Sequence, residues 1–105
     1  MTPLHYAAAC GFYEICKLIV KSTEDKNPDD RNGWTPLHWA AQFGHFDVCK
    51  LLVDNLVERN PEDIRGVTPL HSAASNGHLN ICELLIHVSY VLFTFYKEYY
   101  YFYRG

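Results

Sequence analysis

Thr35-Pro36-Leu37-His38 is the second of three copies of one tetrapeptide, which also occupies residues 2–5 and 68–71. Each copy begins 33 residues after the one before. The other residues that recur in phase are Ala7-Ala8, Ala40-Ala41, Ala73-Ala74, Gly11, Gly44, Gly77, Cys16, Cys49, Cys82, Leu18, Leu51 and Leu84. A fixed period of about 20–50 residues is typical of stacked repeats, in which a single unit cannot bury its own apolar face. The sequence therefore favours a surface built by stacking over a pocket built for chemistry.

The tetrapeptide marks the start of a helix. Asn32-Gly33 predicts a turn just before it, because both residues accept the positive φ that tight turns need. Thr35 is then placed as an N-cap and Pro36 at the first helical position, so we expect a short helix over residues 36–43. The Thr35 hydroxyl should accept a hydrogen bond from the backbone N–H of His38. The His38 imidazole is expected to bond back to that hydroxyl or to the backbone of a neighbouring unit.

The same placement at three helix starts predicts a structural role for every copy of the tetrapeptide. These motif residues are Thr2, Pro3, Leu4, His5, Thr35, Pro36, Leu37, His38, Thr68, Pro69, Leu70 and His71. The three histidines are accordingly interpreted as capping and inter-unit hydrogen-bond groups, and a catalytic ladder is rejected.

A second helix completes the unit. Gly44-His45 should close the first helix, since glycine is the natural residue at a helix C-terminus. Apolar residues at helical spacing predict the second helix from about Phe46. Asn60-Pro61 should end it, because the residue before proline is disfavoured in the helical region. The same helix–turn–helix–loop pattern fits residues 2–30.

At this point the chain resembles the ankyrin repeat family. The pattern is T-P-L-H-x-A-A-x-x-G-H, a helix of V-x-K-L-L type and a D-x-x-G turn, carried here by Thr35–His38, Ala40-Ala41, Gly44-His45, Val48–Leu52 and Asp63–Gly66. The resemblance covers residues 2–86. It implies an all-α ankyrin-repeat solenoid of three stacked helix-turn-helix units joined by turns or short hairpin-like fingers. We expect repeats at approximately 1–30, 31–63 and 64–88 within a domain of residues 1–88, followed by an atypical aromatic-rich tail over residues 89–105.

Two departures from the family pattern carry predictions. Ankyrin units usually have glycine shortly after the second helix, where this chain has Thr23, Leu56 and Ser89. Without a left-handed glycine cap, the second helices of the first two units are predicted to run on to Pro28 and Pro61. Phe12 stands where the other units have the histidine of Gly-His, and we expect burial of its ring to compensate for the lost polar contact.

Both ends of the chain lack the polar outer faces of capping repeats. We therefore expect a fragment of a longer ankyrin array, with further repeats in the parent chain, or a truncated product. For the tail three interpretations stay open: a continued helix that covers the end of the stack, a membrane segment, and translated non-coding sequence. The membrane interpretation is disfavoured, because the apolar stretch over residues 84–96 is shorter than the roughly 20 residues that a spanning helix needs.

Composition and spacing argue against chemistry and against nucleic acid. The net charge of −3 and the scattered basic residues give no nucleic-acid footprint. His45 with Cys49, and His78 with Cys82, have the i, i+4 spacing of metal ligands, but nothing is placed to complete either set. No Gly-x-Gly phosphate loop occurs. We predict no enzymatic activity, no cofactor and no metal, and reduced cysteines that suit a cytoplasmic protein, with the nucleus as a further possibility.

The resemblance implies a partner-binding surface on the turn tips and the exposed side of the first helices. Transferred by position, the candidates are Arg31, Asn32, Trp34, Ile64, Arg65 and Val67 from the turns, with Tyr6, Trp39, Gln42, Phe43, Ser72, Ser75 and Asn76 from the helices. Tryptophan and arginine are frequent binding hot spots, although Trp39 could instead pack between neighbouring first helices. The leading hypothesis is a protein–protein interaction scaffold with an unknown protein partner. The alternatives are the cytoplasmic ankyrin portion of a membrane protein of channel or acyltransferase type, and a truncated product without independent function.

Overall fold

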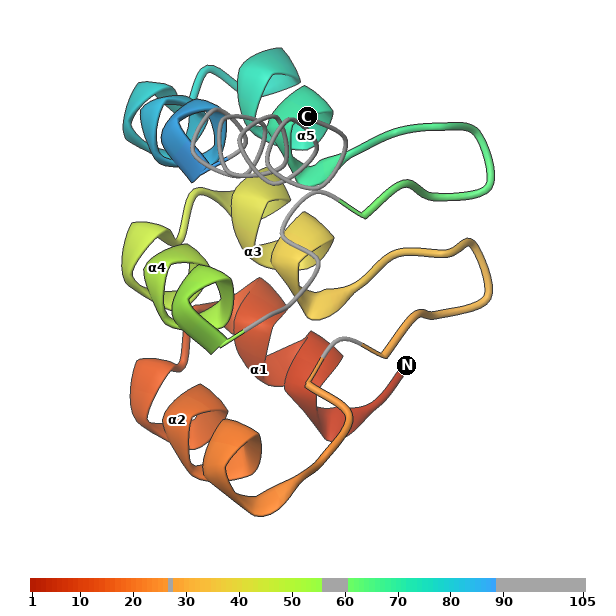
Figure 1. Ribbon diagram of the computed structural model, residues 1–105, viewed down its shortest axis with the longest axis vertical. Helices are drawn as coiled ribbons and strands as arrows, with labels where there is room; N and C mark the ends of the chain where they lie inside the picture. Colours follow the sequence, from red (N-terminus) through yellow and green to blue (C-terminus); the bar gives the residue numbers. More distant parts are fainter. Residues whose placement is uncertain (27, 56–60, 89–105) are drawn as a thin grey trace, which may run out of the picture.

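The computed structural model describes residues 1–26, 28–55 and 61–88, and these residues form three stacked helix pairs (Figure 1). The first helices of the pairs are α1 (Pro3–Cys10), α3 (Pro36–Phe43) and α5 (Pro69–Ser75). The second helices are α2 (Tyr13–Ser22), α4 (Phe46–Asn55) and a helical run over residues 79–88. The first helices lie in one column and the second helices in another (Figure 1). The predicted all-α solenoid is confirmed, and α3 has the bounds expected from the sequence.

Each first helix begins with the same capping box. The hydroxyl of Thr35 accepts from the backbone N–H of His38, and the Nδ1 atom of His38 accepts from the backbone N–H of Thr35 at 3.0 Å. Thr2 with His5 and Thr68 with His71 repeat this exchange. Two of the backbone donors that a helix start leaves open are thereby satisfied within four residues. The tetrapeptide is thus a complete helix-start signal.

The histidines also join one unit to the next. Since Nδ1 of His38 accepts a hydrogen bond, its Nε2 atom carries the ring proton and donates to the carbonyl of Val67 at 2.8 Å. His5 makes the equivalent 2.8 Å bond to the carbonyl of Trp34. In the opposite direction, His45 bonds the carbonyl of Ala9 at 3.0 Å, and His78 bonds that of Gln42 at 3.1 Å. The expected inter-unit role is therefore confirmed for His5 and His38, whereas the exposed His71 has no Nε2 acceptor among the described residues.

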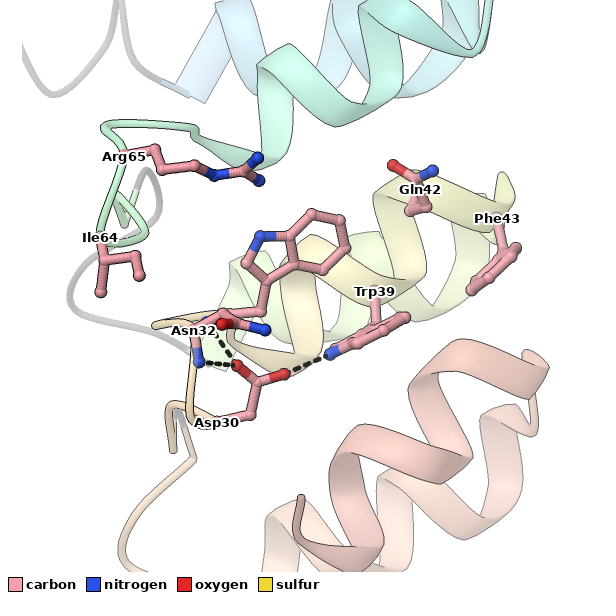
Figure 2. Close-up of a pocket in the computed structure, with 8 residues that line it drawn as sticks. Asp30, Asn32, Trp39, Gln42, Phe43, Ile64 and Arg65 are labelled. Atoms are coloured by element: carbon pink, nitrogen blue, oxygen red, sulfur yellow. Dashed lines mark hydrogen bonds between the residues drawn. The ribbon is translucent and has the colours of Figure 1, made fainter.

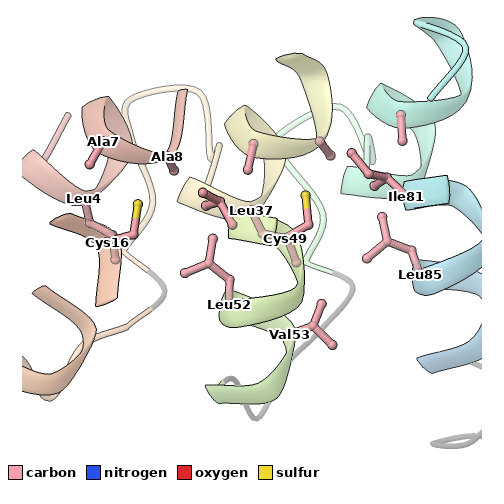
Figure 3. Close-up of a cluster of buried hydrophobic side chains, with 14 of the residues drawn as sticks. Leu4, Ala7, Ala8, Cys16, Leu37, Cys49, Leu52, Val53, Ile81 and Leu85 are labelled. Carbon is pink, nitrogen blue, oxygen red and sulfur yellow. The ribbon is translucent and has the colours of Figure 1, made fainter. Parts of the chain in front are cut away.

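The core consists of small and branched side chains between the two columns of helices (Figure 3). Ala40 and Ala41 are fully buried, and their short side chains let α1 and α5 approach α3 closely. Leu37, Leu52 and Cys49 are fully buried beneath them. The cysteines of the described residues are all free thiols. A buried, unpaired Cys49 behaves as a small apolar residue, as the sequence suggested.

Glycine closes the helices where the two columns connect. Gly44 follows α3 with φ of +79°, in the left-handed region that glycine adopts at little cost. Its backbone also lies close to the next unit, because a Cβ atom added there would lie 2.6 Å from the ring of His78. Gly77 has a similar φ of +73°, but nothing lies within 4 Å of the equivalent position. The glycine of the second unit therefore serves both a turn and an inter-unit contact.

Two sequence predictions about the first unit are wrong. Helix α2 ends at Ser22 and does not run on to Pro28, because Thr23 is already extended, with φ of −126° and ψ of 148°. Phe12 is 55% exposed, since the histidine at its position in the other units packs on the preceding unit and no described unit precedes the first. The predicted extension of α4 to Pro61 and the aromatic tail over residues 89–105 lie outside the described residues.

Burial of His38 predicts a pH dependence of stability. Burial outweighs the opposing effects of the Val67 carbonyl, Asp63 and Asp30, and so lowers the pKa of His38 from 6.5. The folded protein then binds this proton less readily than the unfolded chain. The free energy of unfolding should be insensitive to His38 well above pH 6.5 and should fall as the pH drops through 6.5, by at most about 1.4 kcal/mol per pH unit for one proton. Urea unfolding between pH 8 and pH 5.5 checks this, and His38→Gln, which does not titrate, should flatten the slope.

Candidate functional site

Two loops, which we call fingers, project from the same side of the stack (Figure 1). The first finger is residues 29–34 and the second is residues 62–67. Each closes on itself: the N–H of Asp30 donates to the carbonyl of Trp34, and the N–H of Asp63 donates to that of Val67, both at 2.8 Å. The N–H of Ile64 donates to the carbonyl of Asn32 at 3.2 Å and so couples the two fingers. The hairpin-like fingers expected from the sequence are present.

A groove of about 500 Å³ lies between the fingers and α3 (Figure 2). Its lining residues come from both fingers and from the outer side of α3: Asp30, Asn32, Trp34, Trp39, Gln42, Phe43, Ile64 and Arg65. Ile64 is 75% exposed and Phe43 is 53% exposed, so apolar surface faces solvent here. An open apolar groove with a few polar groups is the usual form of a binding site.

Aromatic rings make up much of the groove. Trp34 and Trp39 meet edge to face, with centroids 4.8 Å apart and an interplanar angle of 65°. Phe43 stacks on Trp39 at 6.1 Å and 14°, and Trp34 stacks on His38 at 5.3 Å. These contacts extend from the first finger to the C-terminal end of α3. Trp39 therefore belongs to the wall of the groove. It lies there together with other residues that the sequence analysis named as candidates for partner binding.

Two aspartates hold the tryptophans in place. The Asp30 carboxylate accepts from the backbone N–H groups of Asn32 and Trp34 through Oδ1, and from the indole N–H of Trp39 at 3.1 Å through Oδ2. The Asp63 carboxylate accepts two backbone N–H groups of its own finger, and its Oδ2 accepts the indole N–H of Trp34 at 2.9 Å. Each aspartate thus shapes one finger and fixes one indole.

Both aspartates are stabilised in their ionised form. Burial raises the pKa of Asp30, but hydrogen bonds from Trp34, Asn32 and Trp39 and the charge of His5 outweigh it and lower the pKa overall. At Asp63, burial is likewise outweighed by donors from Val67, Arg65 and Trp34, which hold its pKa well below the usual range. The fingers therefore keep their negative charges at neutral pH.

Most of the candidate partner-binding residues lie together in the groove. The structure brings together Asn32, Trp34, Trp39, Gln42, Phe43, Ile64 and Arg65. It leaves Tyr6, Arg31, Val67, Ser72, Ser75 and Asn76 outside the lining. Ser72 is only 3% exposed, because a short side chain stands where Tyr6 and Trp39 reach toward solvent with long ones. Sequence reasoning missed Asp30, although the recurrence of Asp-x-x-Gly at Asp30–Gly33 and Asp63–Gly66 marked it.

The residues considered for metal or nucleophilic chemistry have other contacts. His45 and His78 bond carbonyl groups of the preceding unit. Burial, reinforced by Asp47, raises the pKa of the Cys16 thiol to about 11 and that of Cys49 to about 12, which keeps both protonated and unreactive. In the described ranges, no cluster of three or more His, Cys, Asp or Glu side chains could bind a metal ion. Among the described helices, none combines the length and the hydrophobicity that crossing a membrane requires.

Comparison with known proteins supplies one match. A family model described as ankyrin repeats, in three copies, matches residues 4–93. Among curated proteins, none matches the chain significantly.

Proposed function

Because the chain belongs to the ankyrin repeat family, whose members are generally protein–protein interaction modules, we propose that it is a scaffold that binds a partner protein in the groove between its fingers and α3. Enzymatic activity is not typical of this family, and the proposal includes no catalytic step. The free cysteines support a cytoplasmic location, with the nucleus as a second possibility.

The observation that carries this proposal is the fixed geometry of the half-buried tryptophan rings that line the groove. Trp34 and Trp39 are each hydrogen-bonded to a different aspartate, and both lie against the groove. Side chains held before binding lose little conformational entropy when a partner arrives. Tryptophan is also among the residue types enriched at binding hot spots. The groove therefore combines large contact area with preorganisation.

A random-peptide display library selected on the full chain tests this proposal. Binders should lose at least about 5-fold in affinity on Phe43→Ala, because a hot-spot truncation costs more than about 1 kcal/mol. Phe12→Ala is the matched control, since Phe12 is 55% exposed against 53% for Phe43 and does not line the groove. Trp39→Ala should have the same effect as Phe43→Ala.

Affinity of the selected peptides can be measured by fluorescence anisotropy on each variant. Circular dichroism establishes that each variant keeps the helical content of the parent chain. Binders that tolerate Phe43→Ala and Trp39→Ala but are lost on Phe12→Ala would contradict the groove as the partner site.

A further inference from the structure

The two fingers carry an excess of negative charge. Their ionisable residues are Asp29, Asp30, Arg31, Glu62, Asp63 and Arg65. Four carboxylates against two guanidinium groups leave a net charge of −2 on the two loops, of which Asp30 and Arg65 line the groove. Charge complementarity across an interface selects partners and accelerates their encounter. The groove is therefore better matched to a basic partner than to an acidic one.

Asp30 brings one of these charges into the groove. Its Oδ1 atom accepts hydrogen bonds from two backbone N–H groups, whereas the one donor to Oδ2 among the described residues is the indole N–H of Trp39. A carboxylate oxygen can accept more than one hydrogen bond, so Oδ2 retains acceptor capacity on the groove side of the finger. The carboxylate lies beside Trp39, as Figure 2 shows.

The neighbouring rings add a second attraction for a cation. The face of an aromatic ring is electron-rich, and tryptophan binds cations best among the aromatic side chains. Phe43 stacks parallel to Trp39, so two rings continue away from Asp30 along α3. A planar guanidinium group can stack on such rings and donate to a carboxylate at the same time. Rings and carboxylate thus form a site with two independent preferences for positive charge.

We propose that the groove binds an arginine or lysine side chain of the partner protein, with its charged group over Trp39 and within hydrogen-bonding reach of Asp30. This rests on the proposed function of the groove. Arginine is favoured over lysine, because its guanidinium group both stacks and donates in a fork. Arg65 lies on the other side of the groove from Trp39 and Asp30 in Figure 2 and donates to Asp63 at 3.3 Å. The incoming cation therefore occupies the Asp30 side.

A probe titration on the full chain tests this proposal. The chain contains two tryptophans, so Trp34 and Trp39 give two indole N–H signals in an ¹⁵N-correlated NMR spectrum. The probes are N-acetylarginine methylamide and its neutral isostere N-acetylcitrulline methylamide, at constant ionic strength. The arginine probe should shift the Trp39 signal and bind about five-fold more tightly than the citrulline probe, the size of an exposed cation–π contact. Equal affinities for the two probes would overturn the proposal.

Two variants locate the charge preference. Asp30→Asn retains a carbonyl oxygen for the finger but removes the charge, so the preference for the arginine probe should fall to about two-fold or less. Arg65→Gln removes a competing cation whose side chain is 69% exposed, and should therefore increase the affinity for the arginine probe. Phe12→Ala should leave both affinities unchanged. The opposite outcome is that N-acetylglutamate methylamide binds more tightly than the arginine probe and that Arg65→Gln weakens this binding. That result would identify an acidic partner and overturn the proposal.

The outcomes of the probe titration and of the display selection distinguish the cation site from the proposed function of the groove. Display peptides that depend on Phe43 but carry no basic residue would overturn the cation site and leave the proposed function standing. Display peptides that do not depend on the groove would count against both. Enrichment of arginine or lysine at one peptide position, lost on Asp30→Asn, supports the cation site.

Discussion

Replacing His38 with alanine is expected to lower the free energy of unfolding by about 4 kcal/mol. His38 is fully buried, accepts the N–H of Thr35 and donates to the carbonyl of Val67. The alanine variant removes both bonds, leaves a cavity and strands the backbone N–H of Thr35, whereas the carbonyl of Val67 keeps its bond from the N–H of Asp63. Urea unfolding followed by circular dichroism measures the loss.

His71→Ala is the matched control for this prediction. His71 has the same capping box with Thr68 but is exposed and has no Nε2 acceptor among the described residues. Its replacement should cost only about 1 kcal/mol, the value of a helix cap. Equal losses for the two variants would show that the inter-unit bond of His38 contributes nothing measurable.

Replacing Gly44 with alanine is expected to cost about 3 kcal/mol. About 1–2 kcal/mol comes from forcing alanine into the left-handed conformation at φ of +79°. The remainder comes from the collision of the new Cβ atom with the ring of His78, which must turn away and lose its bond to the carbonyl of Gln42. Thermal and urea unfolding of Gly44→Ala give the total.

Gly77→Ala separates these two contributions. Gly77 has nearly the same backbone conformation, with φ of +73°, but its added Cβ atom meets nothing within 4 Å. It should therefore show the backbone cost alone. A loss at Gly77 as large as that at Gly44 would mean that the contact with His78 is relieved without cost.

Much of the fold could be predicted from the sequence because its decisive signals are local. Thr35, Pro36 and His38 specify a helix start within four residues, and Gly44 specifies the end of the same helix. The period of 33 residues then places one unit against the next, so the roles of His5 and His38 follow from repetition. Local capping and a fixed repeat leave few alternative arrangements.

The parts that were missed depend on contacts between units or on competition at a helix end. The exposure of Phe12 follows from which units flank it, and the pattern within one unit carries no information about that. The end of α2 at Ser22 was misjudged because proline marks the last residue at which a helix can end and does not require the helix to reach it. Thr23, a β-branched residue, adopts the extended conformation five residues earlier.

The groove could be predicted only in part for a similar reason. Position within the repeat identified Trp34 and Trp39 as surface candidates, but the orientation of each indole depends on an aspartate. Asp63 belongs to the second finger and reaches Trp34 of the first, a contact across 29 residues of sequence. Such a pairing exists only once the units are stacked.

The histidine bonds between units all end on backbone carbonyl groups. The acceptors belong to Ala9, Trp34, Gln42 and Val67, and Trp34 and Gln42 also line the groove. Every amino acid supplies a backbone carbonyl, so a change of side chain at residue 34 or 42 leaves the acceptor in place. Evolution or a protein engineer can therefore vary what this groove recognises while the histidine connections between the units persist.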